Sequence, residues 1–374
     1  MANKLLLLAN DETTIYNFRR ELLQGLAANG YDLTVAFPVG SHTDEIEACG
    51  CRVVDLPLRR HGTNPFQDFQ YYRNCRRLIR EVRPAAVLTY TVKPNIYGGF
   101  AARREHVPCL NNITGLGTVL QRKSLLASIS LFLQKRSYRS AACVFFQNRS
   151  NYQTMLENGV VAPTTPVQIL PGSGVNLSLH AFTPYRPDDG TTRFLIVSRI
   201  RQDKGFDEFF AAAEMVRRQF PSAEFHVVGW YEEDSYRSRL EELSAHGTII
   251  YHGRKLQEEV HQLMAQSDCV VLPSWHEGMA NVLLEAASTG RIVVASDIPG
   301  CREAFEEGQT GFGCQVKNAA SLASALEKVI RTPYEERRRM GERARQKMER
   351  EFDRKLVVEK YLHVLNEILR NGIA

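Results

Sequence analysis

Short apolar segments alternate with longer amphipathic segments along the chain. The short segments are rich in leucine or β-branched residues, as strands buried on both faces of a sheet are. They lie at residues 4–9, 33–37, 52–56, 86–90, 109–113, 142–147 and 167–170. The segments between them have the spacing of helices that are apolar on one side. Strands that alternate with such helices predict right-handed crossovers and a parallel sheet.

The alternation stops at residues 180–193, where proline, aspartate and glycine cluster without a period. A second series of strands follows, at residues 194–198, 224–229, 249–252, 269–272 and 292–296. An aperiodic segment between two periodic ones is typical of a domain boundary. We therefore expect an α/β protein with two doubly wound, Rossmann-like domains at 1–185 and 186–350. We expect a C-terminal helix at 351–374 that packs back on the first domain.

The composition is that of a soluble globular protein, with 44% hydrophobic and 24% charged residues among 374. No apolar run reaches the roughly 18 residues that span a bilayer, and the apolar start of the chain is too short for a signal peptide. The eight cysteines show no Cys-x-x-Cys spacing. We therefore expect a cytosolic protein whose cysteines are reduced.

Charge is distributed unevenly along the chain. Residues 1–185 hold 20 Lys and Arg against 12 Asp and Glu, a net charge of +8, whereas the rest carries −3. Such asymmetry favours an anionic partner for the first half. Residues 119–139 form a Leu/Phe stripe flanked by basic residues, which suits the anionic inner face of the cell membrane. Packing of the stripe on the sheet is the alternative. The flanking residues are Arg122, Lys123, Lys135, Arg136 and Arg139.

Several common motifs are missing from the sequence. There is no Gly-x-Gly-x-x-Gly after a strand, no Gly-Lys dipeptide and no Gly-x-Ser-x-Gly. These absences weaken a nicotinamide-dinucleotide site and a hydrolase interpretation, and they exclude a P-loop. No Asp-x-Asp and no His/carboxylate cluster has metal-ligand spacing, so we expect no metal and no other cofactor. A bound diphosphate would then have to be neutralised by backbone amides and basic side chains.

The strongest signal follows the strand at 269–272. Glu277 and Glu285 are eight residues apart, about two turns of a helix. The start of that helix would present three free amides, at Met279, Ala280 and Asn281. Amides at a helix start bind anions. The pattern therefore predicts a diphosphate on the helix end, with a carboxylate on each side to accept hydroxyl groups.

Two cations follow the first strand of the same domain. Arg199 stands at the carboxyl end of the strand at 194–198, and Lys204 stands just before the next helix. Both positions can reach phosphates bound at the mouth of the sheet. Alone they would be surface charges, but beside the two glutamates they complete an anion site.

Together these segments resemble the nucleotide-sugar domain of the retaining glycosyltransferases of family 4, which have the GT-B fold of two Rossmann-like domains facing a central cleft. The segments that carry the resemblance are Ser198-Arg199 with Lys204-Gly205, Tyr251-His252-Gly253, Glu277 and Glu285 with Ala286, Gly290, and Ala295-Ser296-Asp297. The chain departs from the family at Met279-Ala280, where Phe-Pro is common; we expect this to alter the fit of the sugar more than the reaction type.

The resemblance also implies roles for single residues. Glu285 would bind the ribose, Arg199 and Lys204 the diphosphate, and Glu277 the donor sugar, so that Glu277, Arg199 and Lys204 act on the reacting groups. Arg254 falls where the base is usually held. The loop that completes the donor site comprises Gly278, Met279, Ala280, Asn281 and Val282.

In the first half, polar or glycine-rich loops follow two strands, at residues 89–99 and 111–117. They resemble the branch of the family that extends polyprenyl-diphosphate-linked oligosaccharides in capsule, O-antigen or bacterial N-glycan assembly. Many members carry His or Glu where Thr114 stands, so no general base is evident. The candidate acceptor-side residues are Tyr16, Asn17, Arg19, Lys93, Asn95, Thr114 and Gly115. Helix capping and ordinary packing are the alternative for the first three.

The resemblance implies a retaining glycosyltransferase, and the missing metal-ligand spacing and the basic, apolar segment add the expectations that it is metal-independent and peripherally membrane-bound. It would move a hexose or N-acetylhexosamine from a UDP-sugar donor to a sugar on undecaprenyl diphosphate. A UDP-sugar 2-epimerase of the same fold is the nearest alternative, and a non-catalytic membrane-binding or nucleic-acid-binding module is another. Nucleic acid is not an expected partner, because few aromatic residues interleave with the arginines and the isoelectric point of about 8.7 is modest.

Overall fold

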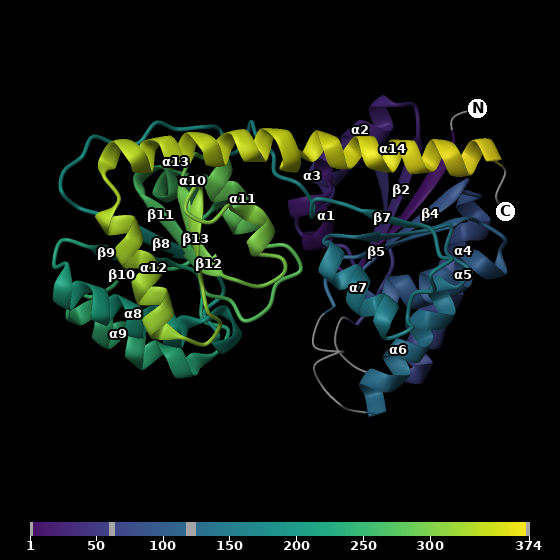
Figure 1. Cartoon of the computed structure of the whole chain (residues 1–374). Helices are drawn as coiled ribbons and strands as arrows, with labels where there is room; N and C mark the ends of the chain where they lie inside the picture. Colours follow the sequence, from purple (N-terminus) through teal and green to yellow (C-terminus); the bar gives the residue numbers. More distant parts are fainter. Residues whose placement is uncertain (1–2, 60–63, 117–124, 372–374) are drawn as a thin grey trace. The chain divides into compact units, whose positions relative to one another are not determined.

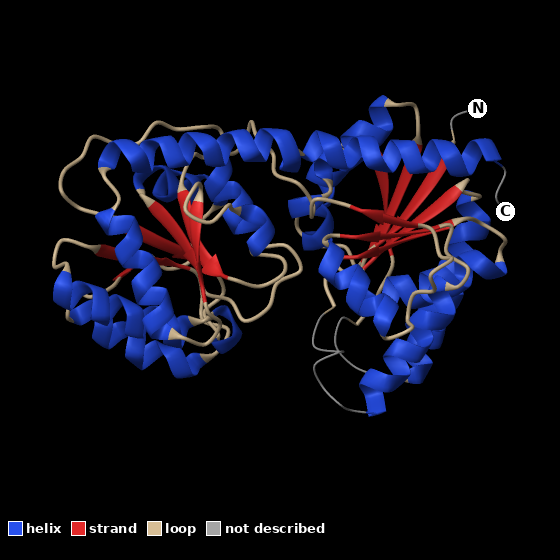
Figure 2. Cartoon of the chain, in the orientation of Figure 1, coloured by secondary structure: helices blue, strands red, loops and turns tan. Residues whose placement is uncertain are grey.

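The computed structural model describes residues 3–59, 64–116 and 125–371. The chain divides into two compact units, and each contains its own parallel sheet. The first unit comprises Met1–Ser173 with Arg354–Ala374, and the second comprises Gly174–Asp353. In each unit, helices cover both faces of the sheet, as Figure 2 shows.

The first sheet has the strand order β3-β2-β1-β4-β5-β6-β7, with every pair parallel. The strand β1, which lies between β2 and β4, is a run of leucines that are fully buried, because helices cover both faces of the sheet. The strands are β1 (Lys4–Leu8), β2 (Asp32–Phe37), β3 (Cys51–Asp55), β4 (Ala86–Tyr90), β5 (Cys109–Ile113), β6 (Cys143–Phe146) and β7 (Val167–Ile169).

The helices of the first unit form two layers (Figure 1). One layer packs through a hydrophobic cluster against the sheet from β2 to β6. It contains α1 (Glu12–Phe18), α2 (Arg20–Ala28), α3 (Thr43–Glu47) and α14 (Arg354–Asn371). The opposite layer contains α4 (Pro65–Val82) and α5 (Gly99–Arg104), which a π-helical turn at Pro94–Gly98 precedes. Near β5 and β6 lie α6 (Leu125–Tyr138) and α7 (Arg149–Glu157).

The C-terminal helix α14 belongs to the first unit. The buried ring of Tyr361 stacks on Phe145, with ring centroids 4.5 Å apart, and its hydroxyl donates to the Asn112 side chain. The division between the units falls at Ser173 and Gly174, earlier than the boundary expected at 185. The reason is that the aperiodic segment packs on the second unit: the Tyr185 hydroxyl donates to the Asp268 carbonyl at 2.8 Å.

The second sheet has the order β10-β9-β8-β11-β12-β13 and is also parallel. Its strands are β8 (Arg193–Val197), β9 (Glu224–Val228), β10 (Ile250–Tyr251), β11 (Cys269–Leu272), β12 (Ile292–Ser296) and β13 (Gly311–Cys314). One face packs on α8 (Phe206–Gln219), α9 (Arg237–Ala245) and α12 (Ala319–Arg331), the other on α10 (Gln257–Gln266), α11 (Asn281–Ser288) and the end of α13 (Tyr334–Lys347). Short 3₁₀ turns lie at Gln202–Lys204, Asp234–Tyr236 and Arg302–Ala304, and a π-helical turn lies at Met348–Phe352.

Each sheet reverses its strand order once, between β1 and β4 in the first unit and between β8 and β11 in the second. At such a point the loops after the two strands diverge, and ligands of doubly wound sheets bind there, beyond the carboxyl ends of the strands. All eight cysteines are free thiols. In the described parts of the chain, no helix combines the length and the apolar character needed to cross a bilayer.

Candidate functional site

The loops after β8 and β11 meet where the second sheet reverses its order. The Trp275 amide donates to the Asp203 carbonyl at 2.9 Å, and His276 Nε2 lies 3.3 Å from Asp203 Oδ2. Gly205 has φ +77, and a Cβ there would collide with the Pro273 carbonyl oxygen. A glycine is needed at this position so that the two loops can approach.

Within this cluster, Lys204 Nζ donates to Glu277 Oε1 at 2.6 Å. The two side chains are only 15% and 14% exposed. A charge pair held largely out of water interacts more strongly than a surface pair and is costly to break by removing one partner. The structure therefore joins two residues that the sequence singled out separately, and it places a cation beside an acceptor of hydroxyl groups.

Arg199 makes a different contact. Its Nη1 donates to Glu232 Oε1 at 3.0 Å, and Arg201 Nη1 lies 3.4 Å from the same carboxylate. The Arg199 side chain is 42% exposed, and an exposed pair of this kind contributes at most about 1 kcal/mol. Arg199 can therefore exchange Glu232 for an anionic ligand at little cost.

The start of α11 differs from the expectation of three free amides. The Ala280 amide donates to the Gly300 carbonyl at 2.8 Å, and the Asn281 amide donates to the Met279 carbonyl at 3.0 Å. The prediction was therefore wrong for these two amides. Within the described residues, the amides of Met279 and Val282 donate no backbone hydrogen bond. The side chains of Met279 and Ala280 are buried in the core of the second unit.

The remaining donor candidates lie around this loop. Glu277 and Gly278 precede α11 by several residues, and Glu285 lies half-buried within the helix. Arg254 is exposed, and its guanidinium carbon lies 5.0 Å from the ring centroid of Trp230. Sequence reasoning missed Trp230, although a tryptophan directly after a predicted strand was the available signal.

Two histidines join the loop after β10 to the sheet. His226 Nδ1 lies 2.9 Å from His252 Nε2, and the rings are stacked with centroids 5.2 Å apart. Burial lowers the pKa of both imidazoles, although the neighbouring Glu224 carboxylate opposes this for His226. Both rings are therefore held in the neutral form. In the portions of the chain that the structure describes, no three His, Cys, Asp or Glu side chains cluster as metal ligands.

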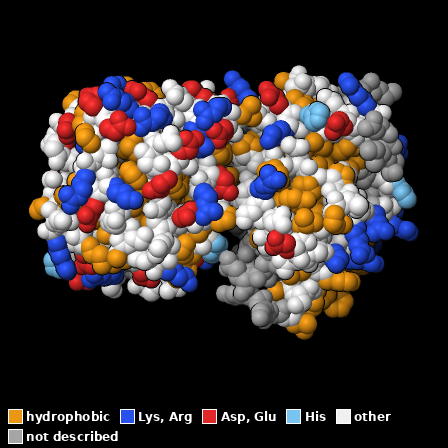
Figure 3. Space-filling view, in the orientation of Figure 1, with side chains coloured by type: hydrophobic (Ala, Val, Ile, Leu, Met, Phe, Trp, Pro, Cys, Tyr) orange, Lys and Arg blue, Asp and Glu red, His pale blue; other side chains and the backbone are white. Residues whose placement is uncertain are grey.

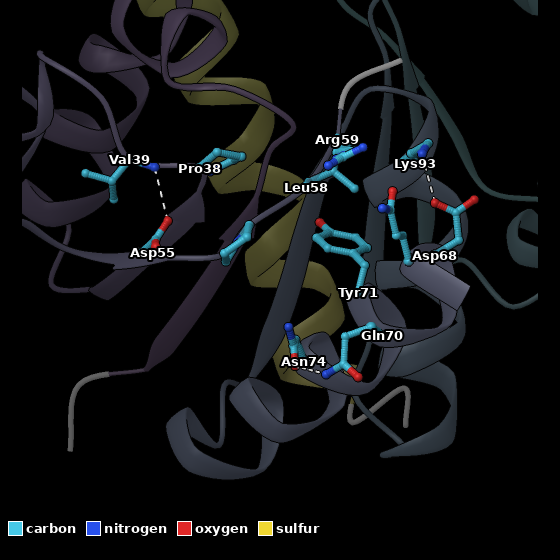
Figure 4. Close-up of a pocket in the computed structure, with 12 residues that line it drawn as sticks. Pro38, Val39, Asp55, Leu58, Arg59, Asp68, Gln70, Tyr71, Asn74 and Lys93 are labelled. Carbon is cyan, nitrogen blue, oxygen red and sulfur yellow. Dashed lines mark hydrogen bonds and ion pairs between the residues drawn. The ribbon is translucent and has the colours of Figure 1, made fainter. Parts of the chain in front are cut away.

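The first unit has a hollow of about 510 Å³ at the carboxyl ends of β2, β3 and β4, shown in Figure 4. Two cations are in its wall, Lys93 and the exposed Arg59. The other lining residues are Pro38, Val39, Asp55, Pro57, Leu58, Gln67, Asp68, Gln70, Tyr71 and Asn74. The amides and cations give this hollow hydrogen-bond donors for a polar ligand, and the carboxylates of Asp55 and Asp68 balance the two positive charges.

Lys93 is held in place by a carboxylate on α4. Its Nζ donates to Asp68 Oδ1 at 2.8 Å, and the Tyr97 hydroxyl donates to Asp68 Oδ2 at 2.9 Å. Burial and the hydrogen bond to Asp68 raise the pKa of Tyr97, so its hydroxyl keeps its proton. Sequence reasoning missed Asp68, because an aspartate in the first turn of a helix gives no signal of a partner 25 residues further along the chain.

Two acceptor-side candidates are buried, so the prediction that they reach a ligand was wrong in this structure. The Asn95 side chain accepts from Thr89 Oγ1 at 2.6 Å and donates to the Asn112 carbonyl at 2.9 Å. Arg19 is 3% exposed, and its guanidinium carbon lies 4.8 Å from the Tyr90 ring centroid. Polar side chains in buried loops form hydrogen bonds with one another, and here these hydrogen bonds fix the conformation of the loops.

The other acceptor-side candidates lie at the surface. Tyr16 stacks on His42 with ring centroids 4.0 Å apart, and Asn17 beside it is exposed. Thr114 and Gly115 are half-buried directly after β5. These positions remain candidates for contact with an acceptor.

The basic segment is described only in part. Arg122 and Lys123 lie outside the described residues; Lys135 is half-buried and Arg136 and Arg139 are exposed. The apolar side chains of α6 are exposed at Leu125, Leu126, Ile129 and Phe132. Its buried residues are instead Ala127, Gln134, Ser137 and Tyr138. The alternative that the apolar stripe packs on the sheet therefore does not hold for the four exposed leucine, isoleucine and phenylalanine side chains. Figure 3 shows hydrophobic side chains gathered over α6.

Comparisons with known proteins match both units. Residues 15–172 match the family model described as "Glycosyl transferase 4-like domain", and residues 181–347 match "Glycosyl transferases group 1". The sequence is 24% identical to N,N'-diacetylbacillosaminyl-diphospho-undecaprenol alpha-1,3-N-acetylgalactosaminyltransferase of Campylobacter jejuni, over 97% of this chain and 98% of that protein.

Two solved structures are similar over nearly the whole chain. Anabaena HepE, in complex with UDP and glucose, has a TM-score of 0.80 at 16% identity, covering 98% of this chain and 100% of that one. A glycosyltransferase of Rickettsia africae has a TM-score of 0.79 at 17% identity, covering 99% of each chain. At these identities the two likenesses establish a shared fold.

Proposed function

The chain is a family 4 glycosyltransferase with the GT-B fold, and we propose that it transfers a hexose or N-acetylhexosamine from a UDP-sugar to a sugar linked to polyprenyl diphosphate. The observation that carries the donor half of this proposal is the Lys204–Glu277 pair at the point where the second sheet reverses its order. A preformed cation and carboxylate at that point suit a ligand that combines phosphates with sugar hydroxyls.

The UDP-sugar donor would bind to the second unit through four of its groups: the diphosphate, the sugar, the ribose and the base. Lys204 and Arg199 bind the diphosphate: Arg199 can leave its exposed carboxylate, and the Lys204 ammonium has further N–H donors for phosphate oxygens while it keeps its bond to Glu277. Glu277 accepts hydroxyls of the donor sugar, and Glu285 on α11 accepts those of the ribose. The exposed Arg254–Trp230 pair offers a flat surface for the base. These cations neutralise the leaving group, so the reaction needs no metal.

The reaction would retain the anomeric configuration. The bond between the sugar C1 and the β-phosphate oxygen breaks, and a bond from the acceptor oxygen to C1 forms on the same face. The proton of the acceptor hydroxyl passes to an oxygen of the departing phosphate, and UDP leaves. Catalysis then rests on positioning and on stabilisation of charge by Lys204 and Arg199, and no side chain serves as nucleophile.

The acceptor would use the first unit. The Campylobacter relative is named for a diphospho-undecaprenol-linked sugar acceptor, and the hollow beside Lys93 and Arg59 has the cations and amides that a sugar diphosphate requires. The exposed apolar side chains of α6, with Arg136 and Arg139, support docking at an anionic membrane surface. The enzyme would then work on the inner face of the cell membrane.

A panel of UDP-sugars tests the proposal. Each donor is incubated with a synthetic prenyl-diphosphate-linked sugar, and the products are read by mass spectrometry. One donor should add the mass of a single hexose or N-acetylhexosamine to the acceptor. Release of a free 2-epimer without transfer would instead identify a UDP-sugar 2-epimerase, and no turnover of any donor would indicate a binding module.

A further inference from the structure

A second hollow, of about 400 Å³, lies in the first unit beside the polar one. Its walls come from the start of α4, the π-helical turn before α5, α5 itself and α6. The lining residues are Pro65, Asp68, Phe69, Tyr72, Tyr97, Phe100 and Leu133. All but Asp68 present hydrocarbon or an aromatic ring, so the hollow suits an apolar ligand of modest size.

Asp68 belongs to both hollows. One of its carboxylate oxygens accepts from Lys93, on the wall of the polar hollow, and the other accepts from Tyr97, on the wall of the apolar one. A single buried carboxylate therefore fixes a cation and an aromatic ring at the two adjoining hollows. A ligand that spans both would have an anionic group at Lys93 and a hydrocarbon part beyond Tyr97.

The apolar hollow opens among exposed hydrophobic side chains. Phe69 at its rim is 59% exposed, and Phe66, one turn earlier on α4, is 86% exposed. Leu125, Leu126, Ile129 and Phe132 are exposed on α6, the helix that supplies Leu133. Large apolar side chains gathered at a surface mark a site for an apolar partner.

We propose that the apolar hollow binds the isoprene units nearest the diphosphate of the acceptor lipid, while Lys93 and Arg59 bind the diphosphate itself. This inference rests on the proposed function and assigns a site for the lipid part of its acceptor. The two hollows adjoin at Asp68, which lines both. This favours the prenyl carrier over a bilayer acyl chain, since only a prenyl diphosphate joins an anionic diphosphate directly to branched hydrocarbon. Through this hollow the enzyme would recognise a prenyl carrier by the isoprene units nearest its diphosphate.

Farnesyl diphosphate, which is soluble without detergent, is the probe. Its binding is measured by calorimetry with the parent, Phe69→Ala and the matched control Phe66→Ala, which is exposed on the same helix but does not line the hollow. Each buried methylene changes affinity by about fourfold, so Phe69→Ala should raise Kd by at least about tenfold. Phe66→Ala should stay within about twofold of the parent.

Three further arms locate the two ends of the ligand. Inorganic diphosphate should bind equally well to Phe69→Ala and to the parent, and more weakly to Lys93→Met. Leu133→Trp fills the hollow and should also weaken farnesyl diphosphate. Lys204→Ala, in the second unit, should leave farnesyl diphosphate binding unchanged, which shows that the probe does not occupy the donor site.

Equal binding of farnesyl diphosphate by the parent and Phe69→Ala would overturn the inference. Displacement of farnesyl diphosphate by dihexanoylphosphatidylglycerol that binds as tightly would also overturn it, because the hollow would then be an acyl-chain site. The transfer assay separates the two proposals. Transfer by Phe69→Ala at the parental rate defeats the inference alone, whereas absence of transfer by the parent, with Phe69-dependent binding intact, defeats the proposed function alone.

Discussion

The ammonium of Lys204 lies 2.6 Å from the carboxylate of Glu277, which joins the loop after β8 to the loop after β11. Both side chains are largely shielded from solvent. The pair holds the second unit's candidate donor site in shape before any ligand binds, because neither charge can move away without leaving the other unpaired.

Replacing Glu277 tests its contact with the donor sugar. Glu277→Gln keeps the size of the side chain and removes the charge that accepts hydroxyls. We expect kcat/KM for the UDP-sugar to fall by more than about tenfold, since a hydrogen bond to a charged group contributes roughly 1.5–3 kcal/mol. Affinity for UDP alone should not weaken, because Lys204 is then free to bind phosphate. A parallel loss of UDP affinity would show that Glu277 acts only by ordering the loops.

Glu285→Ala tests the ribose contact. We expect kcat/KM to fall by more than about tenfold, for the same reason of a lost charged hydrogen bond. The control is Glu342→Ala on α13, where the carboxylate pairs at the surface with Arg338. Parental kinetics in a folded Glu285→Ala enzyme would remove Glu285 from the donor site.

The His226–His252 contact predicts a pH-dependent stability. The pKa of each imidazole is lowered by burial, so below about pH 6.5 the unfolded chain binds more protons than the folded one. The contribution of the two neutral imidazoles to the free energy of unfolding is fully present above that pH and is lost as the pH falls. In His252→Gln, the drop in Tm between about pH 7 and about pH 5 should be smaller.

Calorimetric scans of the parent, His252→Gln and His363→Gln at several pH values make this comparison. His363 is exposed on α14 in the first unit, and its replacement should leave the pH dependence as it is in the parent. An unchanged pH dependence of Tm in His252→Gln would mean that the pKa of this imidazole is the same in the folded and the unfolded protein.

We predict that activity survives EDTA, because cationic side chains neutralise the departing diphosphate. Initial rates are compared with and without the chelator, after the protein has been passed through a chelating column. Loss of activity with EDTA that Mn²⁺ or Mg²⁺ restores would show that a metal carries this charge.

Membrane docking is tested by replacing Arg122, Lys123, Lys135, Arg136 and Arg139 with Gln. Each cation near an anionic surface contributes about 1 kcal/mol, so the variant should no longer sediment with anionic vesicles. Parental binding should also fade in 1 M salt, where the Debye length is about 3 Å. The control, Arg338→Gln with Arg339→Gln on α13, should still sediment. If the five-residue variant sediments like the parent, another surface meets the membrane.

The fold follows from local pattern wherever apolar runs are long enough to be distinctive. The leucines at 5–8 and the valines of β11 and β12 are fully or almost fully buried, and their strands lie where the pattern predicts them. The strand β13 has no such pattern, because two of its four residues are glycine. The boundary at Ser173 was also beyond local pattern, since the packing of Tyr185 on Asp268 depends on a distant residue.

Residue type and position relative to the predicted strands were enough to identify single residues of the site, but not the contacts between them. Lys204 and Glu277 were each found beside a strand end, but their pairing joins loops that lie 73 residues apart in sequence. Asn95 and Arg19 were misjudged because a polar residue in a turn or at a helix end can equally face a ligand or satisfy a buried loop. Only the tertiary contacts with Thr89, Asn112 and Tyr90 decide between the two.

Calorimetric titration with UDP tests most directly that the loops after β8 and β11 form a nucleotide-sugar site. The parent should bind one UDP, and Lys204→Ala should raise its Kd by at least about tenfold, because a charged contact to phosphate is lost. Lys328→Ala, which removes an exposed lysine of α12, should bind UDP like the parent. UDP binding to Lys204→Ala with the parental Kd would contradict the account.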